Sequence, residues 1–319
     1  MVKKLPPLDA RIPAWNLDDL NERNCPTCNS SNANPVYERP DDLKVRFCSK
    51  CSTFFVSPAP SGAQLERFYN DYDEKHRRAP KVGVKELAAS YNNVDPLADL
   101  RIRELDSLMD FADTRVLDIG FGRAYFLYCL KKLGAVPFGL ELDPQAIQFA
   151  KHLGLENVFL GDIADFASET RFDLITLLDL VEHPLEPMEV LRKSTDLLQP
   201  GGFLLIWTPN GDFSRHEESP TTFRVDLEHM QYLTPDACTF IASELKLRVT
   251  HLETIGFPAL EGIDVPLSMI DAPANPLKGL VKSLPGFSAI NKFRHRLFSE
   301  FQDERRGAYH LFCIMQKPF

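Results

Sequence analysis

The sequence contains no long run of apolar residues. Among its 319 residues, no window approaches the roughly 18 uninterrupted apolar positions that a membrane-spanning helix needs. The opening stretch, MVKKLPPLDARIPAWN, has two lysines but no apolar segment behind them, so no secretory signal is predicted. These two absences lead us to expect a cytoplasmic protein.

The sequence also has little excess positive charge. Lys and Arg together number 36, against 45 Asp and Glu, which gives a formal net charge of −9. This balance argues against a nucleic-acid-binding surface that runs over the whole chain. Internal repeats and low-complexity tracts are absent as well, which excludes a repeat architecture.

Four of the seven cysteines form two close pairs with the spacing C-x2-C-x19-C-x2-C: Cys25, Cys28, Cys48 and Cys51. Each C-x2-C pair directs two thiolates to one point, and two pairs give a closed tetrahedral zinc site with no position left for water. A reducing compartment favours metal binding over disulfides. We therefore predict a structural Zn²⁺ that holds a small ribbon together. The alternative is a set of four unligated buried cysteines.

From residue 115 onward, strand-like apolar runs alternate with helical stretches. The strands are expected at 115–119, 136–142, 157–160, 172–178 and 203–209, and two more at 248–257 and 308–318. Continuous apolar strands that alternate with helices predict a mainly parallel sheet covered on both faces.

The stretch RVLDIGFGRAYFL joins the first of these strands to a helix through a glycine turn. The dinucleotide fingerprint G-x-G-x-x-G places a third small residue three positions after its second glycine. Here Gly120 and Gly122 are followed by Ala124, one position early. Asp118 ends the strand, and a carboxylate there would repel a pyrophosphate at the helix N-terminus. The turn therefore suits a cofactor with a cationic end, such as the sulfonium and ammonium groups of S-adenosylmethionine (SAM).

Two further acids fit the adenosine half of SAM. Glu141 ends the second strand, and its carboxylate can accept hydrogen bonds from both ribose hydroxyls. Asp162 follows the third strand in FLGDIADF and can accept a hydrogen bond from the adenine amino group.

Five pieces in order, VLDIGFGRA, GLELDP, GDIADF, FDLITLLDLVEHP and LLQPGGFLLIWTPN, resemble class I SAM-dependent methyltransferases of the ubiquinone-biosynthesis-like group. The resemblance covers residues 115–260. It implies an α/β, Rossmann-like, seven-stranded sheet with helices on both faces, here behind a small zinc ribbon. It also implies that the glycine turn binds the methionine moiety, the acid after strand two the ribose, and the GD pair the adenine. The cofactor-binding residues carried over are Asp118, Gly120, Gly122, Glu141, Leu142, Asp162, Ile163 and Asp179.

The acceptor side of the site is expected after the fourth strand. Asp179, Glu182 and His183 follow that strand, and ligands of open α/β sheets bind at the carboxyl ends of strands. Methyl transfer needs alignment of the acceptor with the methyl group, and a base if the acceptor is a hydroxyl. A histidine titrates near neutral pH, so we predict His183 as the base. An orienting or helix-capping role for His183 is the alternative.

The long loop after the fifth strand supplies the other candidates. Loops of this length in a compact domain are usually functional or disordered. EHMQYLTP resembles an H-x-x-Y/F-hydrophobic-T/S-P element of ubiquinone-type methyltransferases, which implies that His229 and Tyr232 lie near the acceptor. Arg224 is a candidate anion contact. The alternative for each residue is an ordinary solvated loop.

Residues 272–299 contain no acid, and five Lys and Arg residues are mixed there with apolar ones. One interpretation is a basic amphipathic lid that meets a membrane surface, a lipid-linked glycan or an anionic carrier. The other is a partly helical cover over the pocket. Pro276 and Pro285 break any long helix and favour the cover.

The predicted organisation follows from these segments: a flexible arm 1–20, a zinc ribbon 21–60, a helical connector 61–112, a SAM-binding methyltransferase domain 113–260, a basic insertion or lid 261–307, and a last strand within 308–319. The ribbon followed by FFVSPAPSGAQLERFYNDY resembles an N-terminal zinc module of bacterial small-molecule methyltransferases. This resemblance implies methyl transfer to a small-molecule hydroxyl, on a sugar, glycan or secondary metabolite, free or attached to a lipid or carrier. The rivals are an RNA base methyltransferase, a non-catalytic SAM-binding protein and an NAD-dependent oxidoreductase. The near-neutral ribbon argues against the first and Asp118 against the last. The sequence leaves the oligomeric state open.

Overall fold

A computed structural model describes residues 2–8, 12–70, 83–213, 215–256 and 307–319. The predicted insertion 261–307 therefore lies outside the described residues except for its last position. Within the described ranges, no helix is both long enough and apolar enough to cross a membrane.

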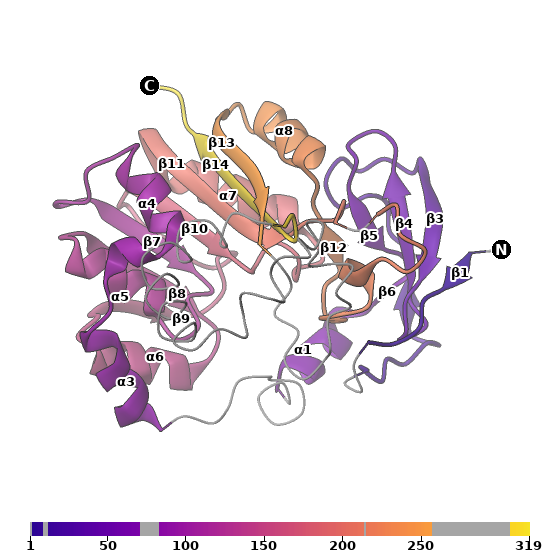
Figure 1. Cartoon of the computed structure of the whole chain (residues 1–319), viewed down its shortest axis with the longest axis horizontal. Helices are drawn as coiled ribbons and strands as arrows, with labels where there is room; N and C mark the ends of the chain where they lie inside the picture. The colour runs from indigo at the N-terminus through magenta and orange to yellow at the C-terminus, as the bar shows by residue number, and fades with distance from the viewer. Residues whose placement is uncertain (1, 9–11, 71–82, 214, 257–306) are drawn as a thin grey trace, which may run out of the picture.

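The larger part of the chain forms a seven-stranded sheet in the order β13-β14-β11-β10-β7-β8-β9 (Figure 1). Neighbouring strands are parallel except at β14, which runs antiparallel to both of its neighbours. The strands are β7 (Arg115–Ile119), β8 (Val136–Glu141), β9 (Asn157–Leu160), β10 (Phe172–Leu178), β11 (Leu198–Pro209), β13 (Arg248–Ile255) and β14 (His310–Gln316). All seven strands lie where the sequence places them, and β11 begins five residues earlier than the expected start at 203.

Both faces of this sheet are covered. The helices are α4 (Leu100–Asp106), α5 (Tyr125–Lys132) and α6 (Pro144–His152) on one face, and α7 (Pro187–Leu197) and α8 (Pro235–Glu244) on the other. Strand β14 illustrates the division, because Phe312 and Ile314 pack with the first group of helices and Leu311, Cys313 and Met315 with the second. The predicted α/β architecture with helices on both faces is confirmed.

The N-terminal residues form a second, five-stranded sheet in the order β1-β3-β4-β5-β12. Its strands are β1 (Lys3–Lys4), β3 (Ala33–Glu38), β4 (Lys44–Cys48), β5 (Phe54–Val56) and β12 (Gln231–Tyr232). β12 comes from the long loop after β11, so this sheet contains residues from both halves of the sequence. Figure 1 shows the module beside the large sheet, with β12 lying between the two. A small strand pair, β2 (Leu20–Asn21) with β6 (Ala59–Pro60), completes it.

The expected flexible arm, residues 1–20, is packed onto the body wherever the structure describes it. β1 pairs with β3, and the side chain of Leu5 is only 1% exposed. The indole of Trp15 donates to Asp41 Oδ2 at 2.8 Å. Gln64 in helix α1 (Gly62–Asn70) accepts from the backbone of Asn16 at 2.7 Å. Proline-rich composition removes helical periodicity, but it does not prevent a segment from being anchored by individual buried side chains.

The connector between the two sheets contains several helices in the residues that the structure describes. Besides α1 it contains α3 (Val84–Asn92), a short 3-10 helix η1 (Pro96–Ala98) and α4. A second 3-10 helix, η2 (Thr221–Phe223), lies in the loop after β11. Asp99 separates η1 from α4 and caps α4 by accepting a hydrogen bond from the backbone of Arg101 at 2.9 Å. This cap brings the Arg101 side chain to the strand ends of the large sheet.

Candidate functional site

The glycine turn between β7 and α5 has the conformation that its sequence demands. Gly120 and Gly122 have φ of 73° and 52°, and Ala124, which precedes α5, has φ of 56°. These values lie in the left-handed region, where glycine is favoured because it lacks a Cβ. A Cβ on Gly120 would lie 3.0 Å from the Leu180 side chain. At the carboxyl end of β7 the backbone of the turn therefore carries no side chain at Gly120 and Gly122.

Glu141 ties this turn to the end of the neighbouring strand. Its Oε2 accepts the backbone N–H of Gly122 at 2.8 Å, and its Oε1 accepts the N–H groups of Leu142 at 2.7 Å and Asp143 at 3.1 Å. The next strand end is joined in turn, because Gly161 N–H donates to the Glu141 carbonyl at 3.0 Å. The carboxylate thus lies at the centre of the edge formed by β7, β8 and β9.

The predicted adenine-side residues flank this carboxylate. Leu142 is 65% exposed, an unusual position for a leucine, while Ile163 is buried. Asp162 is exposed and its Oδ1 accepts the backbone N–H of Ala164 at 2.7 Å, which shapes the turn after β9. An exposed apolar side chain beside two acids gives this edge the mixture of groups that cofactor sites use.

Asp118 lies beneath the glycine turn and is almost completely buried. Its Oδ1 accepts from Thr176 Oγ1 at 2.6 Å. Burial, with a smaller contribution from the nearby Glu141 charge, raises the pKa of Asp118 to about 7 against the lowering effects of Thr176 and Arg101. A carboxyl group that titrates near neutral pH at the end of a strand is a feature typical of functional sites.

Arg101 is a site residue that the sequence argument missed. Its guanidinium pairs with Asp99 through bonds of 3.0 and 2.6 Å, and its Cζ lies 5.1 Å from the ring centre of Phe126 and 5.2 Å from that of Trp207. Its charge acts on the carboxyl groups of both Asp118 and Asp179. The sequence feature that could have indicated Arg101 is its position between two apolar residues, Leu100 and Ile102, which are buried where the helix packs on the sheet.

A compact polar cluster lies after β10, where Glu182 and His183 meet His229 from the loop after β11. One carboxylate oxygen of Glu182 and one ring nitrogen of each histidine lie within 4.8 Å of one another. These atoms are close enough to bind a proton or a cation together. The two imidazole rings meet edge to face with centroids 4.8 Å apart. Glu182 Oε1 is 4.0 Å from His229 Nε2, and Glu182 Oε2 accepts from Thr208 Oγ1 at 2.7 Å. Burial raises the pKa of Glu182 well above its usual range.

Helix α1 of the connector contacts His183. The hydroxyl of Tyr69, in helix α1, lies 2.7 Å from His183 Nδ1, and the two rings meet edge to face. Burial lowers the pKa of His183 below its ordinary value, so the ring is neutral at pH 7. A neutral imidazole is able to take up a proton. The structure brings His183 and His229 together beside the strand ends, and the catalytic role of each stays a prediction.

The side chains of Tyr232 and Arg224 are both engaged with other parts of the protein. Because β12 pairs with β5, the Tyr232 side chain is 0% exposed among Leu5, Val45, Phe54 and Phe223, and its ring centre lies 6.0 Å from that of His229. Burial raises its pKa to about 12, so its hydroxyl stays protonated at neutral pH.

The Arg224 guanidinium is engaged with main-chain carbonyls of the protein. It donates to Pro6 O at 2.7 Å and Ser219 O at 3.3 Å, and these bonds attach the loop to the N-terminal arm. The predicted anion contact at Arg224 is therefore not supported by its placement.

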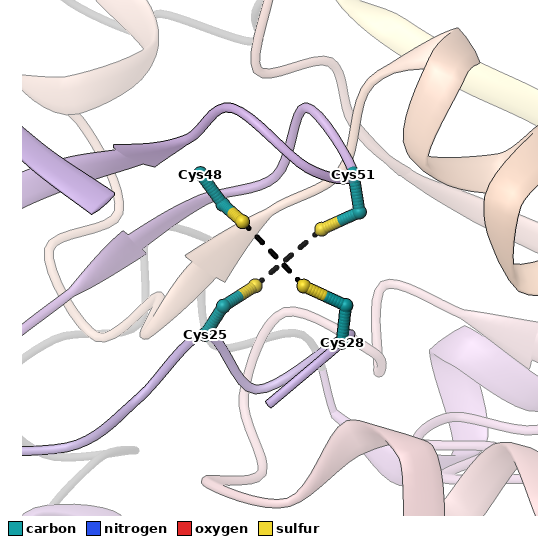
Figure 2. A group of neighbouring side chains, drawn as sticks. All are labelled: Cys25, Cys28, Cys48 and Cys51. Carbon is teal, nitrogen blue, oxygen red and sulfur yellow. Dashed lines mark hydrogen bonds between the residues drawn. The ribbon is translucent and has the colours of Figure 1, made fainter. Parts of the chain in front are cut away.

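The four paired cysteines converge in the N-terminal module. Figure 2 shows their sulfur atoms pointing to a common centre from two separate turns. Cys25 Sγ lies 3.4 Å from Cys51 Sγ, and Cys28 Sγ lies 3.5 Å from Cys48 Sγ. All four sulfurs lie within 4.8 Å of one another. A disulfide needs sulfurs about 2.05 Å apart, so the group is a set of four thiols.

Comparison with known proteins places this fold and site in context. A family profile described as "Methyltransferase domain" matches residues 84–252, more than half of the chain, and leaves out the four paired cysteines. A "Ubiquinone biosynthesis O-methyltransferase" from Xanthomonas oryzae pv. oryzae is 28% identical over 144 residues, which are 43% of this chain and 57% of that protein. A protein of the same description from Shewanella sp. is 25% identical over 209 residues, 63% of this chain and 84% of that one. Among solved structures, a SAM-dependent methyltransferase from Archaeoglobus fulgidus aligns with 79% of this chain and 99% of its own, with 19% identity and a TM-score of 0.47.

Proposed function

The chain belongs to the SAM-dependent methyltransferase family, and we propose that it transfers the methyl group of SAM to a hydroxyl oxygen of a small molecule. The observation that carries the proposal is the Glu141 carboxylate bonded to the glycine turn at Gly122. Oxygen as the receiving atom is supported by the relatives, whose names describe O-methyltransferases, although the first of them is matched over only 57% of its length. The proposed acceptor is a sugar, a glycan or a secondary-metabolite intermediate.

In this proposal SAM lies along the edge formed by β7, β8 and β9. Its cationic methionine end lies over Asp118 and the glycine turn, and Arg101, whose charge acts on Asp118, is a candidate contact for its carboxylate. Glu141 receives the ribose hydroxyls. Leu142 and Ile163 contact the two faces of the adenine, which accounts for the exposed Leu142 side chain.

The reaction is a displacement at the methyl carbon. The acceptor oxygen forms a bond to this carbon as the carbon–sulfur bond breaks, and the sulfonium becomes a neutral thioether. The hydroxyl proton passes to a neutral imidazole. We assign this role to His183, which Tyr69 orients at 2.7 Å, and we assign acceptor positioning to His229.

A radiolabelled-methyl experiment tests the function. We expect purified protein to bind SAM and S-adenosylhomocysteine in calorimetry, and to transfer label from methyl-labelled SAM to a small-molecule fraction of cell extract. Label in that fraction should survive nuclease treatment. Loss of labelling after nuclease would indicate an RNA acceptor, and binding without transfer to any fraction would indicate a non-catalytic SAM-binding protein.

We also propose that the four cysteines hold Zn²⁺. A tetrahedral ion with Zn–S bonds of about 2.3 Å places its sulfurs about 3.8 Å apart. The observed separations of 3.4 and 3.5 Å lie close to that value. With four protein ligands the ion has no open position, so it would stabilise the ribbon and take no part in methyl transfer.

Removing the proposed base should lower turnover and leave cofactor binding intact. We expect His183→Ala to reduce kcat by about 100-fold or more, because general base catalysis contributes factors of this size. Affinity for SAM should change less than about twofold, since the imidazole contacts the acceptor side. The measurement is label transfer into the accepting fraction, with His216→Ala, an exposed histidine of the loop after β11, as the control. Full turnover in both His183→Ala and His229→Ala would place the base elsewhere.

SAM affinity should rise with pH through the titration of Asp118. At pH 6 this carboxyl, with a pKa of about 7, is mostly protonated, and binding a cation beside it must displace the proton. At pH 8 it is already ionised, so we expect affinity to be up to about tenfold higher than at pH 6. Thr176, Arg101 and Glu141 are the groups that face Asp118 and set its pKa. Calorimetry of SAM binding at the two pH values measures the effect. Asp118→Asn should abolish this dependence, and an unchanged slope in that variant would assign it to another group.

A further inference from the structure

Arg39 belongs to the ribbon, yet most of its contacts reach the loop after β11. Its side chain is 0% exposed. Nε donates to Asp41 Oδ1 at 3.0 Å, and Nη2 donates to Asp41 Oδ2 and to the carbonyl of Leu227. Nη1 donates to the carbonyl of His229 at 2.6 Å and to the hydroxyl of Tyr232 at 3.0 Å. One guanidinium therefore binds the main-chain carbonyls of Leu227 and His229 and the side-chain hydroxyl of Tyr232.

The segment that Arg39 binds, residues 227–232, is held on its opposite side by the loop after β10. The N–H of Met230 donates to the Glu182 carbonyl at 2.8 Å. The side-chain amide of Gln231 donates to the carbonyls of Val181 at 2.6 Å and Pro184 at 2.8 Å. The segment that carries His229 is thus fixed between the ribbon and the strand end that carries Glu182 and His183.

A second ribbon arginine supports the same arrangement. Arg23 donates to the Met230 carbonyl at 2.6 Å and to Leu185 O at 2.9 Å. In addition, β12 extends the ribbon sheet through the pairs Gln231–Phe55 and Tyr232–Phe54. The ribbon therefore contacts this segment through main-chain pairing and two guanidinium groups.

Burial of an ion pair is a poor way to gain stability, because removing two charges from water offsets much of their attraction. Arg39 and Asp41 have side chains that are both 0% exposed. What the pair does provide is a fixed set of directed donors, since a guanidinium presents its N–H groups in one plane. This property suits a residue that must hold several acceptors in one geometry.

We propose that Arg39 is a positioning residue that orients His229 for methyl transfer, and that the ribbon thereby completes the acceptor half of the site. The inference rests on the proposed function for the role of His229, but the contacts that it explains do not depend on it. Arg39 does not touch substrate or cofactor in this proposal; it acts through the main chain of residues 227–232.

The chain offers a matched control for a test. Arg46 is also a ribbon arginine, and it donates to the carbonyls of Ser57 at 3.1 Å and Ala33 at 3.5 Å and pairs with Glu22 at 3.5 Å. All of these partners belong to the ribbon. Arg46→Gln therefore weakens the ribbon without removing a contact to residues 227–232.

The experiment compares Arg39→Lys, Arg39→Gln and Arg46→Gln by hydrogen–deuterium exchange. Arg39→Lys keeps a positive charge beside Asp41, so it protects the fold, but one ammonium cannot reach the carbonyls of Leu227 and His229 and the Tyr232 hydroxyl together. We expect exchange in residues 227–232 to accelerate by about tenfold or more in both Arg39 variants. Exchange in 115–163, zinc content and affinity for S-adenosylhomocysteine should stay unchanged, and Arg46→Gln should leave 227–232 protected.

Kinetics separates positioning from general stability. In the Arg39 variants we expect kcat to fall by about 100-fold with the KM for SAM unchanged, as misplacement of a catalytic group predicts. Arg39→Lys should recover part of the turnover lost in Arg39→Gln. Unchanged exchange in 227–232, or equal acceleration over the whole chain, would overturn the proposal. Failure of the unaltered protein to bind S-adenosylhomocysteine would instead overturn the proposed function and leave the exchange result standing.

Discussion

Glu141→Ala is expected to weaken SAM binding by about 100-fold or more. Hydrogen bonds to a charged group contribute about 1.5–3 kcal/mol each, and two ribose hydroxyls would lose their shared acceptor. The substitution also releases the N–H groups of Gly122, Leu142 and Asp143, which the carboxylate now accepts at 2.7 to 3.1 Å. The glycine turn would thus lose its side-chain link to the end of β8, and the backbone bond from Gly120 N–H to the Leu140 carbonyl would remain. Calorimetry with SAM and with S-adenosylhomocysteine measures both affinities.

Glu156→Ala is the matched control for this experiment. Glu156 is an exposed glutamate just before β9, on the same half of the sheet, and should have no effect on either affinity. Equal affinities of Glu141→Ala and the unaltered protein would remove Glu141 from the cofactor site. The position of SAM along the edge of β7, β8 and β9 would then have to be abandoned.

Loss of the proposed zinc is expected to have the second large effect. Structural zinc in small modules contributes about 10–16 kcal/mol of apparent binding free energy, which matches or exceeds the stability of a typical domain. Cys25→Ser, followed by dialysis against a chelator, should therefore lose its metal and unfold residues 21–60. Turnover should disappear with it, because residues 227–232 would lose the strand β5 and the side chain of Arg39. Elemental analysis and thermal unfolding measure the two consequences.

Cys129→Ala provides the comparison. Cys129 is buried in the core on the α5 side of the large sheet, away from the four-cysteine group. This variant should keep its full zinc content while losing some stability through the small cavity left behind. A Cys25→Ser protein that retains zinc at the level of Cys129→Ala would show that Cys25 is not a ligand.

The sequence was most informative where a local pattern decides the structure. Alternating apolar runs predicted the large sheet because its central strands are buried on both faces, and the glycines at 120 and 122 predicted a turn that only small residues adopt easily. The chemistry of Asp118 and Glu141 could be inferred for the same reason. The proposed role of each acid is inferred directly from its position at the end of a strand.

The sequence was least informative about long-range contacts. The motif around Tyr232 predicted a residue near the acceptor, and it gave no sign that pairing with β5 would bury that side chain in the ribbon core. Arg39 looked like one of several charges in a near-neutral ribbon, because nothing in its neighbourhood indicates that residue 229 will lie beside it. Arg101 was missed in the same way, since its role depends on where α4 packs. Such contacts depend on tertiary structure and leave no periodic signal.

The pairing of β5 with β12 also constrains how the protein is made. β5 leaves the ribosome long before Gln231 and Tyr232 are synthesised, so one edge of the small sheet has no partner during most of translation. An open strand edge is a template for unwanted association. The nascent N-terminal module therefore exposes such an edge until the second half of the chain arrives. Deleting the first 60 residues would create the converse problem, a catalytic part with the edge of β12 and the carbonyls of Leu227 and His229 stripped of their partners.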